Sequence, residues 1–299
     1  AAAQCISENI CEPILLGHTR RINAVKEELG LEFECETIDV RYDPRRRGAY
    51  AKEFHKLRGR KGLTMEDAVR LLKTTTYFGP MMVHMEDADG YLGGISHNYP
   101  DIVKPCLQTI GPATDTHRIV GMYMMTVNGQ LMFIGDATIN IYPDSRTLAE
   151  IAVQTAKVAR RFGVKPKVAM LSFSNFGTSG EMRTDRIEEA VRIARELDPG
   201  IIIDGPMQAD TALIEEIQGN YPFMEFEGAA NVLICPNLAS ANIAYKLLQR
   251  IAGAEMTGPI LEGLAKPAHV LQRDDSVREV VHMAAICAVD AQRHSTQKL

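Results

Sequence analysis

Short apolar segments alternate with amphipathic helical segments through the central third of this chain, and this alternation restricts the folds that it can adopt. Residues 183–197 show the helical pattern clearly, because Ile187, Val191 and Ala194 recur on one helix face. Strands separated by helices usually pair in parallel, so the pattern predicts an α/β fold with a largely parallel sheet. The expected helices lie at 148–161, 183–197 and 239–251, and the expected strands at 167–173, 201–204 and 231–235.

A hydrophobic segment over residues 119–134 interrupts this pattern. Its Asn128-Gly129 pair is a strong hairpin signal, so we expect two antiparallel strands there. The segment follows Gly111-Pro112-Ala113, where a helical stretch ends, and this change predicts a domain boundary. Elsewhere we expect helices over 20–29, from Thr64 onward and over 277–291, and a strand over 268–271.

Composition excludes several classes of protein. The chain has 299 residues, 45% hydrophobic and 24% charged, which is ordinary for a globular protein. Its net charge of -5 argues against a nucleic-acid-binding protein, and no apolar run approaches the ~20 residues needed to cross a membrane. The six cysteines form no C-x-x-C pair and the eight histidines show no metal-ligand spacing, so we expect free thiols, a cytoplasmic location and no metal site.

The chain begins Ala1-Ala2-Ala3-Gln4, without Met, and continues into a stretch typical of the tail of a helix. We expect a fragment of a longer polypeptide, with a processed N-terminus as the alternative.

Four loops are the expected places for chemistry, because function in α/β folds gathers at the carboxyl ends of strands. The first carries four cations and two glycines before a helix start, a composition that suits phosphate. The others combine small residues with hydroxyl, imidazole or amide groups. Taken singly, the first is better explained as a solvated basic turn and the second as a turn with a satisfied His. The third is a weak signal by itself, because Ser/Gly loops are common. The four loops are residues 56–64, 93–105, 171–180 and 258–276.

In this order, these segments resemble phosphate acetyltransferases and phosphate butyryltransferases, most specifically over residues 228–246 and 258–267. The resemblance implies two three-layer α/β/α subdomains separated by a cleft, a fold like that of isocitrate and isopropylmalate dehydrogenases. It also implies that acetyl-CoA binds in this cleft. We place the first subdomain at 1–112 plus 268–299, without the N-terminal strand and helix of the family. The second, at 113–267, is expected to form a homodimer or a larger homo-oligomer.

Within this family, the runs 172–177 and 266–271 resemble the C-terminal domain of bacterial hybrid malic enzymes. Active transferases typically carry Thr-Lys where this chain has Asn175-Phe176. The resemblance implies that acetyl-CoA binds here as an allosteric inhibitor of malate decarboxylation. The sites for NADP and for Mg²⁺ or Mn²⁺ are then expected only in a fused malic enzyme domain outside this chain, which itself needs no cofactor.

The family alignment also suggests weakened catalysis. Gln272 stands where active members have Ser, Glu279 where they have the Asp assigned as base, and Pro206 where they have Glu. Ser276 and Glu279 also have capping-box spacing, so Glu279 has a structural role open to it, and we commit to no catalytic residue. The cations survive better. The expected acetyl-CoA- or phosphate-binding residues are Arg58, His97, Lys104, Ser172, Ser174, Asn175, Lys266, Gln272 and Arg273.

Three hypotheses follow, in this order. The first is an acetyl-CoA-sensing domain of an NADP-dependent malic enzyme. The second is a working phosphate acetyltransferase, and the third is a module that serves only oligomerisation.

Overall fold

The computed structural model describes residues 1–114, 116–127, 129–176 and 182–296. The chain divides into two compact units. Unit 1 comprises Ala1–Thr116 and Leu264–Leu299, and unit 2 comprises His117–Gly263. The sequence placed these two divisions at 112/113 and 267/268, within a few residues of the observed ones.

Unit 2 is built on a six-stranded mixed sheet. Four strands run parallel in the order β7-β6-β8-β5, and the antiparallel strands β4 and β9 complete one side. The predicted hairpin is confirmed, since Val127 of β4 pairs with Gln130 of β5. The strands are β4 (Val120–Val127), β5 (Gln130–Gly135), β6 (Lys167–Leu171), β7 (Ile202–Met207), β8 (Val232–Ile234) and β9 (Glu255–Glu262).

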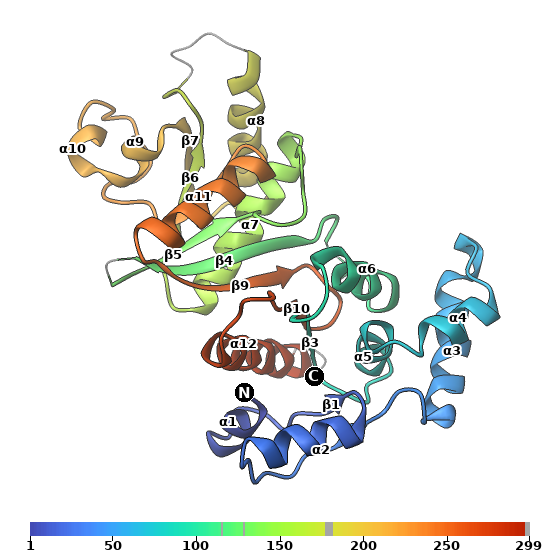
Figure 1. Ribbon diagram of the computed structural model, residues 1–299. Coiled ribbons are helices and arrows are strands. Elements are labelled where there is room, and N and C mark those ends of the chain that lie inside the picture. Colours follow the sequence, from blue (N-terminus) through green and yellow to red (C-terminus); the bar gives the residue numbers. More distant parts are fainter. Residues whose placement is uncertain (115, 128, 177–181, 297–299) are drawn as a thin grey trace. The chain divides into compact units, whose positions relative to one another are not determined.

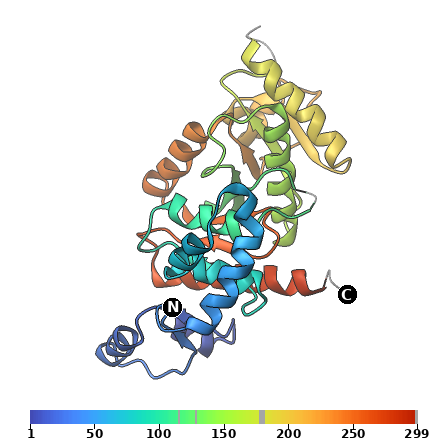
Figure 2. The ribbon, with the colours of Figure 1, turned by 90° about the vertical axis from the view of Figure 1, so that its right-hand side faces the viewer.

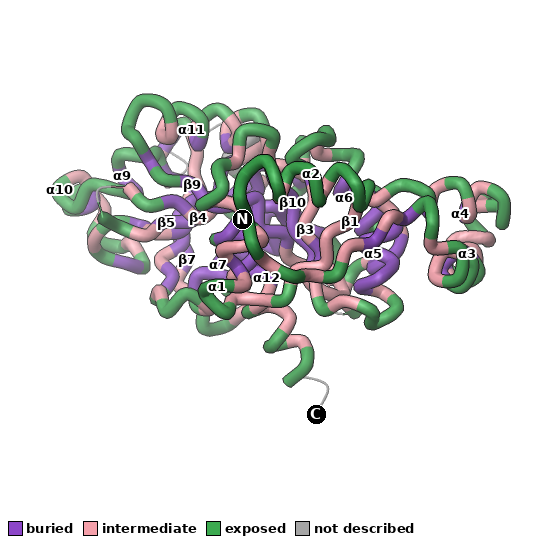
Figure 3. The backbone as a smooth tube through the Cα atoms, turned by 60° about the horizontal axis from the view of Figure 1, so that its bottom comes forward, coloured by how far each residue is buried: buried purple, intermediate pink, exposed green. Residues whose placement is uncertain are grey.

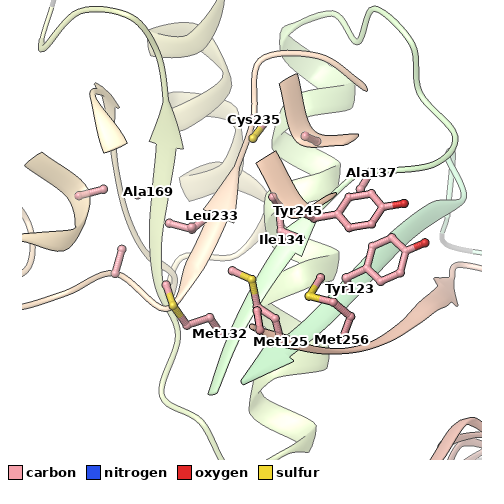
Figure 4. Packing of buried hydrophobic residues seen from close by; sticks show 14 of the residues in the cluster. Tyr123, Met125, Met132, Ile134, Ala137, Ala169, Leu233, Cys235, Tyr245 and Met256 are labelled. Atoms are coloured by element: carbon pink, nitrogen blue, oxygen red, sulfur yellow. The ribbon is translucent and has the colours of Figure 1, made fainter. Parts of the chain in front are cut away.

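Helices cover both faces of this sheet (Figure 1). On one face lie α7 and α8, and α7 approaches so closely that a Cβ on Gly135 would stand 2.2 Å from Thr155 Oγ1. The other face is covered by α11 and the short α9, and Tyr123 of β4 stacks there on Tyr245 with 4.3 Å between ring centroids (Figure 4). The helices are α7 (Ser145–Arg161), α8 (Met182–Leu197), α9 (Ala209–Leu213), α10 (Glu215–Gln218) and α11 (Leu238–Ile251).

Unit 1 holds two short parallel strand pairs, β1 with β2 and β3 with β10, among helices. Helix α5 is almost wholly buried, whereas α12 runs out to the C-terminal end (Figures 2 and 3). The elements are α1 (Ala2–Ser7), β1 (Leu15–Leu16), α2 (Thr19–Glu28), β2 (Thr37–Ile38), α3 (Pro44–Arg58), the 3₁₀ helix η1 (Gly59–Lys61), α4 (Met65–Leu71), α5 (Thr75–His84), β3 (Tyr91–Gly93), α6 (Tyr99–Thr109), β10 (Ala268–Val270) and α12 (Val277–Thr296).

The α/β class is confirmed, and three of the predicted loops need correction. Residues 56–61 belong to the end of α3 and to η1, and residues 99–105 belong to α6. Residues 258–262 lie in β9, whose Gly258-Pro259 pair looked like loop punctuation. The pairing of β4 with β9 shifts register between Met122 and Met124, opposite this pair, and β9 is an edge strand, where proline is tolerated.

Within the described residues, no helix combines the length and apolarity that a membrane span requires. The same part of the chain contains no group of three or more His, Cys, Asp or Glu side chains that could hold a metal ion. All six cysteines are free thiols.

Candidate functional site

The loops that follow β3 and β10 begin side by side in unit 1. These strands pair in parallel, and the backbone N–H of Leu271 donates to Gly93 O at 2.8 Å. Gly94 makes the approach possible, because a Cβ at this residue would stand 1.9 Å from Leu271 O. Its φ of +145° is also a backbone conformation that favours glycine. Both loops therefore leave the carboxyl edge of one strand pair.

A hydrogen bond joins the two loops further on. Arg273 Nη2 donates to Asn98 Oδ1 at 3.3 Å, and Asn98 is the N-cap residue of α6. The side chains of His97 and Arg273 are exposed, and His97 Nδ1 lies 3.2 Å from Ser96 Oγ. Thus the structure brings together His97, Gln272 and Arg273, three of the predicted binding residues, between the beginnings of α6 and α12.

Two further predicted cations, Lys104 and Arg58, lie on helices α6 and α3 of unit 1. Lys104 is exposed on α6. Arg58 is half-buried in the last turn of α3, where its charge acts on the hydroxyl of Tyr77. Burial nevertheless raises the pKa of Tyr77, whose hydroxyl donates to Gln108 of α6 at 2.7 Å. Arg58 is therefore near the Tyr77–Gln108 hydrogen bond that joins α5 to α6.

The turn that carries Gln272 and Arg273 is closed by Asp275. The carboxylate of Asp275 accepts from the backbone N–H of Gln272 at 2.7 Å, and its own N–H donates to Gln272 O at 3.2 Å. Burial, helped by the charges of Glu279 and Asp274, raises the pKa of Asp275 to about 6. The sequence reading did not single out this residue.

The predicted capping box at the start of α12 is present. Ser276 N donates to Glu279 Oε2 at 2.6 Å, and Glu279 N donates to Ser276 Oγ at 3.3 Å. The carboxylate that the sequence analysis expects at the position of the family base therefore holds the end of a helix.

Lys266 lies at the C-terminal end of α5. Its ammonium donates to Val83 O at 2.9 Å and to His84 O at 3.0 Å, and Glu86 Oε1 lies 3.2 Å away. A cation at a helix C-terminus satisfies carbonyls that lack partners within the helix and complements the helix dipole. This geometry gives Lys266 a structural role, where the sequence suggested a ligand contact.

In unit 2, Asn175 joins the loops that follow β6 and β7. Its Oδ1 accepts from Gln208 N at 2.8 Å, and its Nδ2 donates to Tyr221 Oη at 3.0 Å and to Gln208 Oε1 at 3.3 Å. The amide thus has protein partners for both its oxygen and its nitrogen. Of the predicted serines in this loop, Ser172 is half-buried and Ser174 is buried.

An aromatic cluster stands beside Asn175. The ring of Phe176 packs against Tyr221 at 5.1 Å and edge-on against Phe223 at 4.9 Å between centroids. Phe176 has a φ of 45°, unusual for a residue with a side chain. Residues 177–181, which belong to the loop predicted over 171–180 and its C-terminal flank, lie outside the described residues.

Asp136 organises the loop after β5 and was missed from the sequence. It is 4% exposed and accepts from the backbone N–H groups of Gly121, Thr138, Ile139 and Asn140 and from Asn140 Nδ2. Burial raises the pKa of Asp136, although these donors act in the opposite direction. An Asp directly after a strand, with Thr and Asn two and four residues on, was the available signal.

These features define a class of protein. Two helix N-terminal ends and an exposed guanidinium at the carboxyl edge of parallel strands are suited to binding a phosphorylated ligand. The chain is therefore an α/β protein with a candidate anion-binding site in unit 1. Comparison with known proteins makes the class specific: the chain belongs to the phosphate acetyl/butaryl transferase family, whose family model matches residues 1–288.

Individual relatives agree with this assignment. A phosphate acetyltransferase from Corynebacterium glutamicum is 36% identical over 293 residues, which are 97% of this chain and 89% of that protein. An NADP-dependent malic enzyme from Salmonella typhimurium is 35% identical over 300 residues, which are 98% of this chain but 39% of that enzyme. The crystal structure of a phosphotransacetylase from Streptococcus pyogenes superposes with a TM-score of 0.91 at 35% identity, covering 98% of this chain and 89% of that one. Sequence identity thus does not rank the malic enzyme above the transferases.

Proposed function

We propose that this chain is the phosphotransacetylase-like domain of a hybrid NADP-dependent malic enzyme, and that it binds acetyl-CoA as an allosteric inhibitor. The observation that carries the proposal is the capping box, in which Glu279, at the position of the family base, bonds to Ser276. A carboxylate held in this way is poorly placed to take a proton from the CoA thiol. Loss of a positioned base typically lowers a rate by ~10²–10⁴.

Binding needs less than catalysis. Phosphate groups require cations and N–H donors, and the site retains Arg273 beside the beginnings of two helices, with Lys104 on α6 and Arg58 on α3. Lys266 and Asn175 are left out of the proposed contacts because protein atoms already engage their polar groups. NADP and a divalent metal would belong to the fused malic enzyme domain, outside this chain.

The second candidate is an active phosphate acetyltransferase, which converts acetyl-CoA and phosphate to acetyl phosphate and CoA. It is supported by the 36% identity to the transferase from Corynebacterium glutamicum, most of whose length this chain covers.

One assay separates these two functions. The chain is mixed with acetyl phosphate and CoA, thioester formation is followed by absorbance, and the Corynebacterium glutamicum transferase is the positive control. We expect this chain to be slower by ~10²–10⁴ because its base is misplaced. Calorimetry should still detect acetyl-CoA binding. Turnover comparable to the control would refute the regulatory proposal, whereas no detectable acetyl-CoA binding would leave only oligomerisation.

Oligomerisation is proposed alongside binding. Helix α11 exposes a stripe of three aliphatic residues one turn apart, Ile243, Leu247 and Ile251, which are 59%, 51% and 80% exposed. Such a stripe suits the isologous contact of a homodimer. We expect Leu247→Glu to lower the solution mass measured by light scattering, while Lys246→Glu, beside the stripe, leaves the mass unchanged.

A further inference from the structure

Two hydrogen bonds between Gln272 and Asp275 close a turn in the unit 1 site. Asp275 forms two hydrogen bonds with Gln272, one through its carboxylate at 2.7 Å and one through its backbone N–H at 3.2 Å. Arg273 lies inside the loop that these bonds close, and its guanidinium is fixed at the other end by Asn98 at 3.3 Å. Removing the carboxylate therefore leaves the turn with only the longer backbone bond and loosens the backbone that presents Arg273.

The hydrogen-bond acceptor that Asp275 provides and the negative charge that it carries have separate effects on this turn. A hydrogen bond from an N–H can be accepted by a carboxylate, by the carbonyl oxygen of a protonated acid or by the oxygen of an amide. Asp, protonated Asp and Asn can all accept this hydrogen bond, whereas Ala leaves only the bond from the backbone N–H of residue 275 to Gln272 O. The negative charge is thus not needed for the turn, although it strengthens the hydrogen bond.

The negative charge of Asp275 lies close to other carboxylates. The groups that act on Asp275 are Glu279 of α12 and Asp274 of the same loop, both acidic. The facing loop and α6 contribute His97 and Asp101, and Asn98 Nδ2 donates to Asp101 at 3.2 Å. A carboxylate in the same four-residue turn as Arg273 partly cancels the field that an anionic ligand would feel there.

We propose that Asp275 is a positioning residue, which sets Arg273 through its bonds to Gln272 and whose negative charge weakens the hold on an anionic ligand, so that protonation tightens binding. This inference rests on the proposed function, because it takes acetyl-CoA as the ligand of this site. Since burial and the neighbouring carboxylates raise the pKa of Asp275 to about 6, the change falls in a range that cells can reach.

The test is calorimetry with acetyl-CoA between about pH 5 and pH 8 on the wild type and on Asp275→Asn, Asp275→Ala and Arg273→Ala. At about pH 7.5 we expect Asp275→Asn to bind at least as tightly as the wild type. Asp275→Ala should bind about fivefold more weakly, the equivalent of one ordinary hydrogen bond. As the pH falls through about 6, the wild type should gain affinity relative to Asp275→Asn. The phosphate monoester of the ligand also titrates near pH ~6, and this comparison cancels that effect.

The outcomes are distinguishable. If Arg273→Ala binds acetyl-CoA normally, the proposed site itself is wrong. If Arg273→Ala weakens binding but Asp275→Ala and Asp275→Asn behave alike at every pH, the site stands and the positioning role of Asp275 is overturned. If Asp275→Asn keeps the full relative pH dependence of the wild type, the charge effect belongs to another group.

Discussion

Glu279 and Ser276 bond to each other reciprocally, with Glu279 Oε2 accepting from Ser276 N at 2.6 Å and Ser276 Oγ accepting from Glu279 N at 3.3 Å. The carboxylate that could have served as a base therefore caps α12. We expect Glu279→Ala to lower the free energy of unfolding by about 1 kcal/mol, the usual cost of losing a cap. Glu279→Gln should cost far less, because glutamine retains the acceptor. Urea titration of both variants measures the difference, and a Glu279→Ala protein as stable as the wild type would show that the cap contributes nothing.

Arg273 should dominate binding of the ligand phosphates. Hydrogen bonds to charged groups contribute about 1.5–3 kcal/mol, so Arg273→Ala should weaken acetyl-CoA about ten- to a hundredfold. Arg273→Lys should restore only part of this loss, because an ammonium lacks the bidentate fork of a guanidinium. In a full-length hybrid enzyme, the same variant should shift acetyl-CoA inhibition of malate decarboxylation to higher concentration. Unaltered inhibition would argue that another pocket senses the ligand.

Lys266 provides the matched control for Arg273. It is also a cation of unit 1, but its ammonium bonds to Val83 O and His84 O at the end of α5. We expect Lys266→Ala to lower the free energy of unfolding by about 1 kcal/mol while leaving acetyl-CoA affinity unchanged. Thermal unfolding and calorimetry on the same preparation test both parts. If Lys266→Ala unfolds like the wild type but binds acetyl-CoA more weakly, Lys266 is a ligand contact and not a structural residue.

Asp275 should make stability depend on pH in a predictable direction. Its pKa is about 6 in the folded chain, raised from an ordinary 3.8, so the folded state binds the proton more tightly between these values. Stability from this group is therefore highest below about pH 4 and falls as the pH rises through about 6. Asp275→Asn should remove that fall, and unfolding curves at several pH values would show it as a smaller slope. A steeper slope in the variant would contradict the burial argument.

The helices and strands of unit 2 could largely be predicted because periodic apolar patterns carry them. In α8, the residues expected on one face are buried, with Ile187 at 3%, Val191 at 5% and Ala194 at 0% exposure. Strand β9 was missed because Gly258-Pro259 normally ends a strand, and only the register shift against β4 explains its place. Such a shift is a tertiary feature that local sequence does not encode.

The site was predicted unevenly for the same reason. The loops were found by composition, and the grouping of His97 with Arg273 follows from the parallel pairing of β3 with β10, which places their loops at one edge. Composition does not show which polar side chains form hydrogen bonds within the protein and are therefore not available to a ligand. Lys266 and Asn175 were chosen for their chemistry, yet each bonds to residues distant in the sequence.

Gly94 lets the loops after β3 and β10 approach closely because it has no side chain. We therefore expect its replacement to destabilise unit 1 strongly. A methyl group there would stand 1.9 Å from Leu271 O, on a backbone with φ +145°. The clash adds to the strain of that conformation, so Gly94→Ala should lower the free energy of unfolding by about 3 kcal/mol or more. Gly111→Ala is the matched control, since φ is +76° but nothing lies within 4 Å of the added carbon. It should cost only the backbone strain of about 1–2 kcal/mol.

Because Gly94 separates β3 from the loop that carries Asn98, any Gly94→Ala protein that still folds should also bind acetyl-CoA more weakly, whereas Gly111→Ala should not. Equal unfolding energies for the two variants would mean that the β3 and β10 loops are not packed as closely as these distances require.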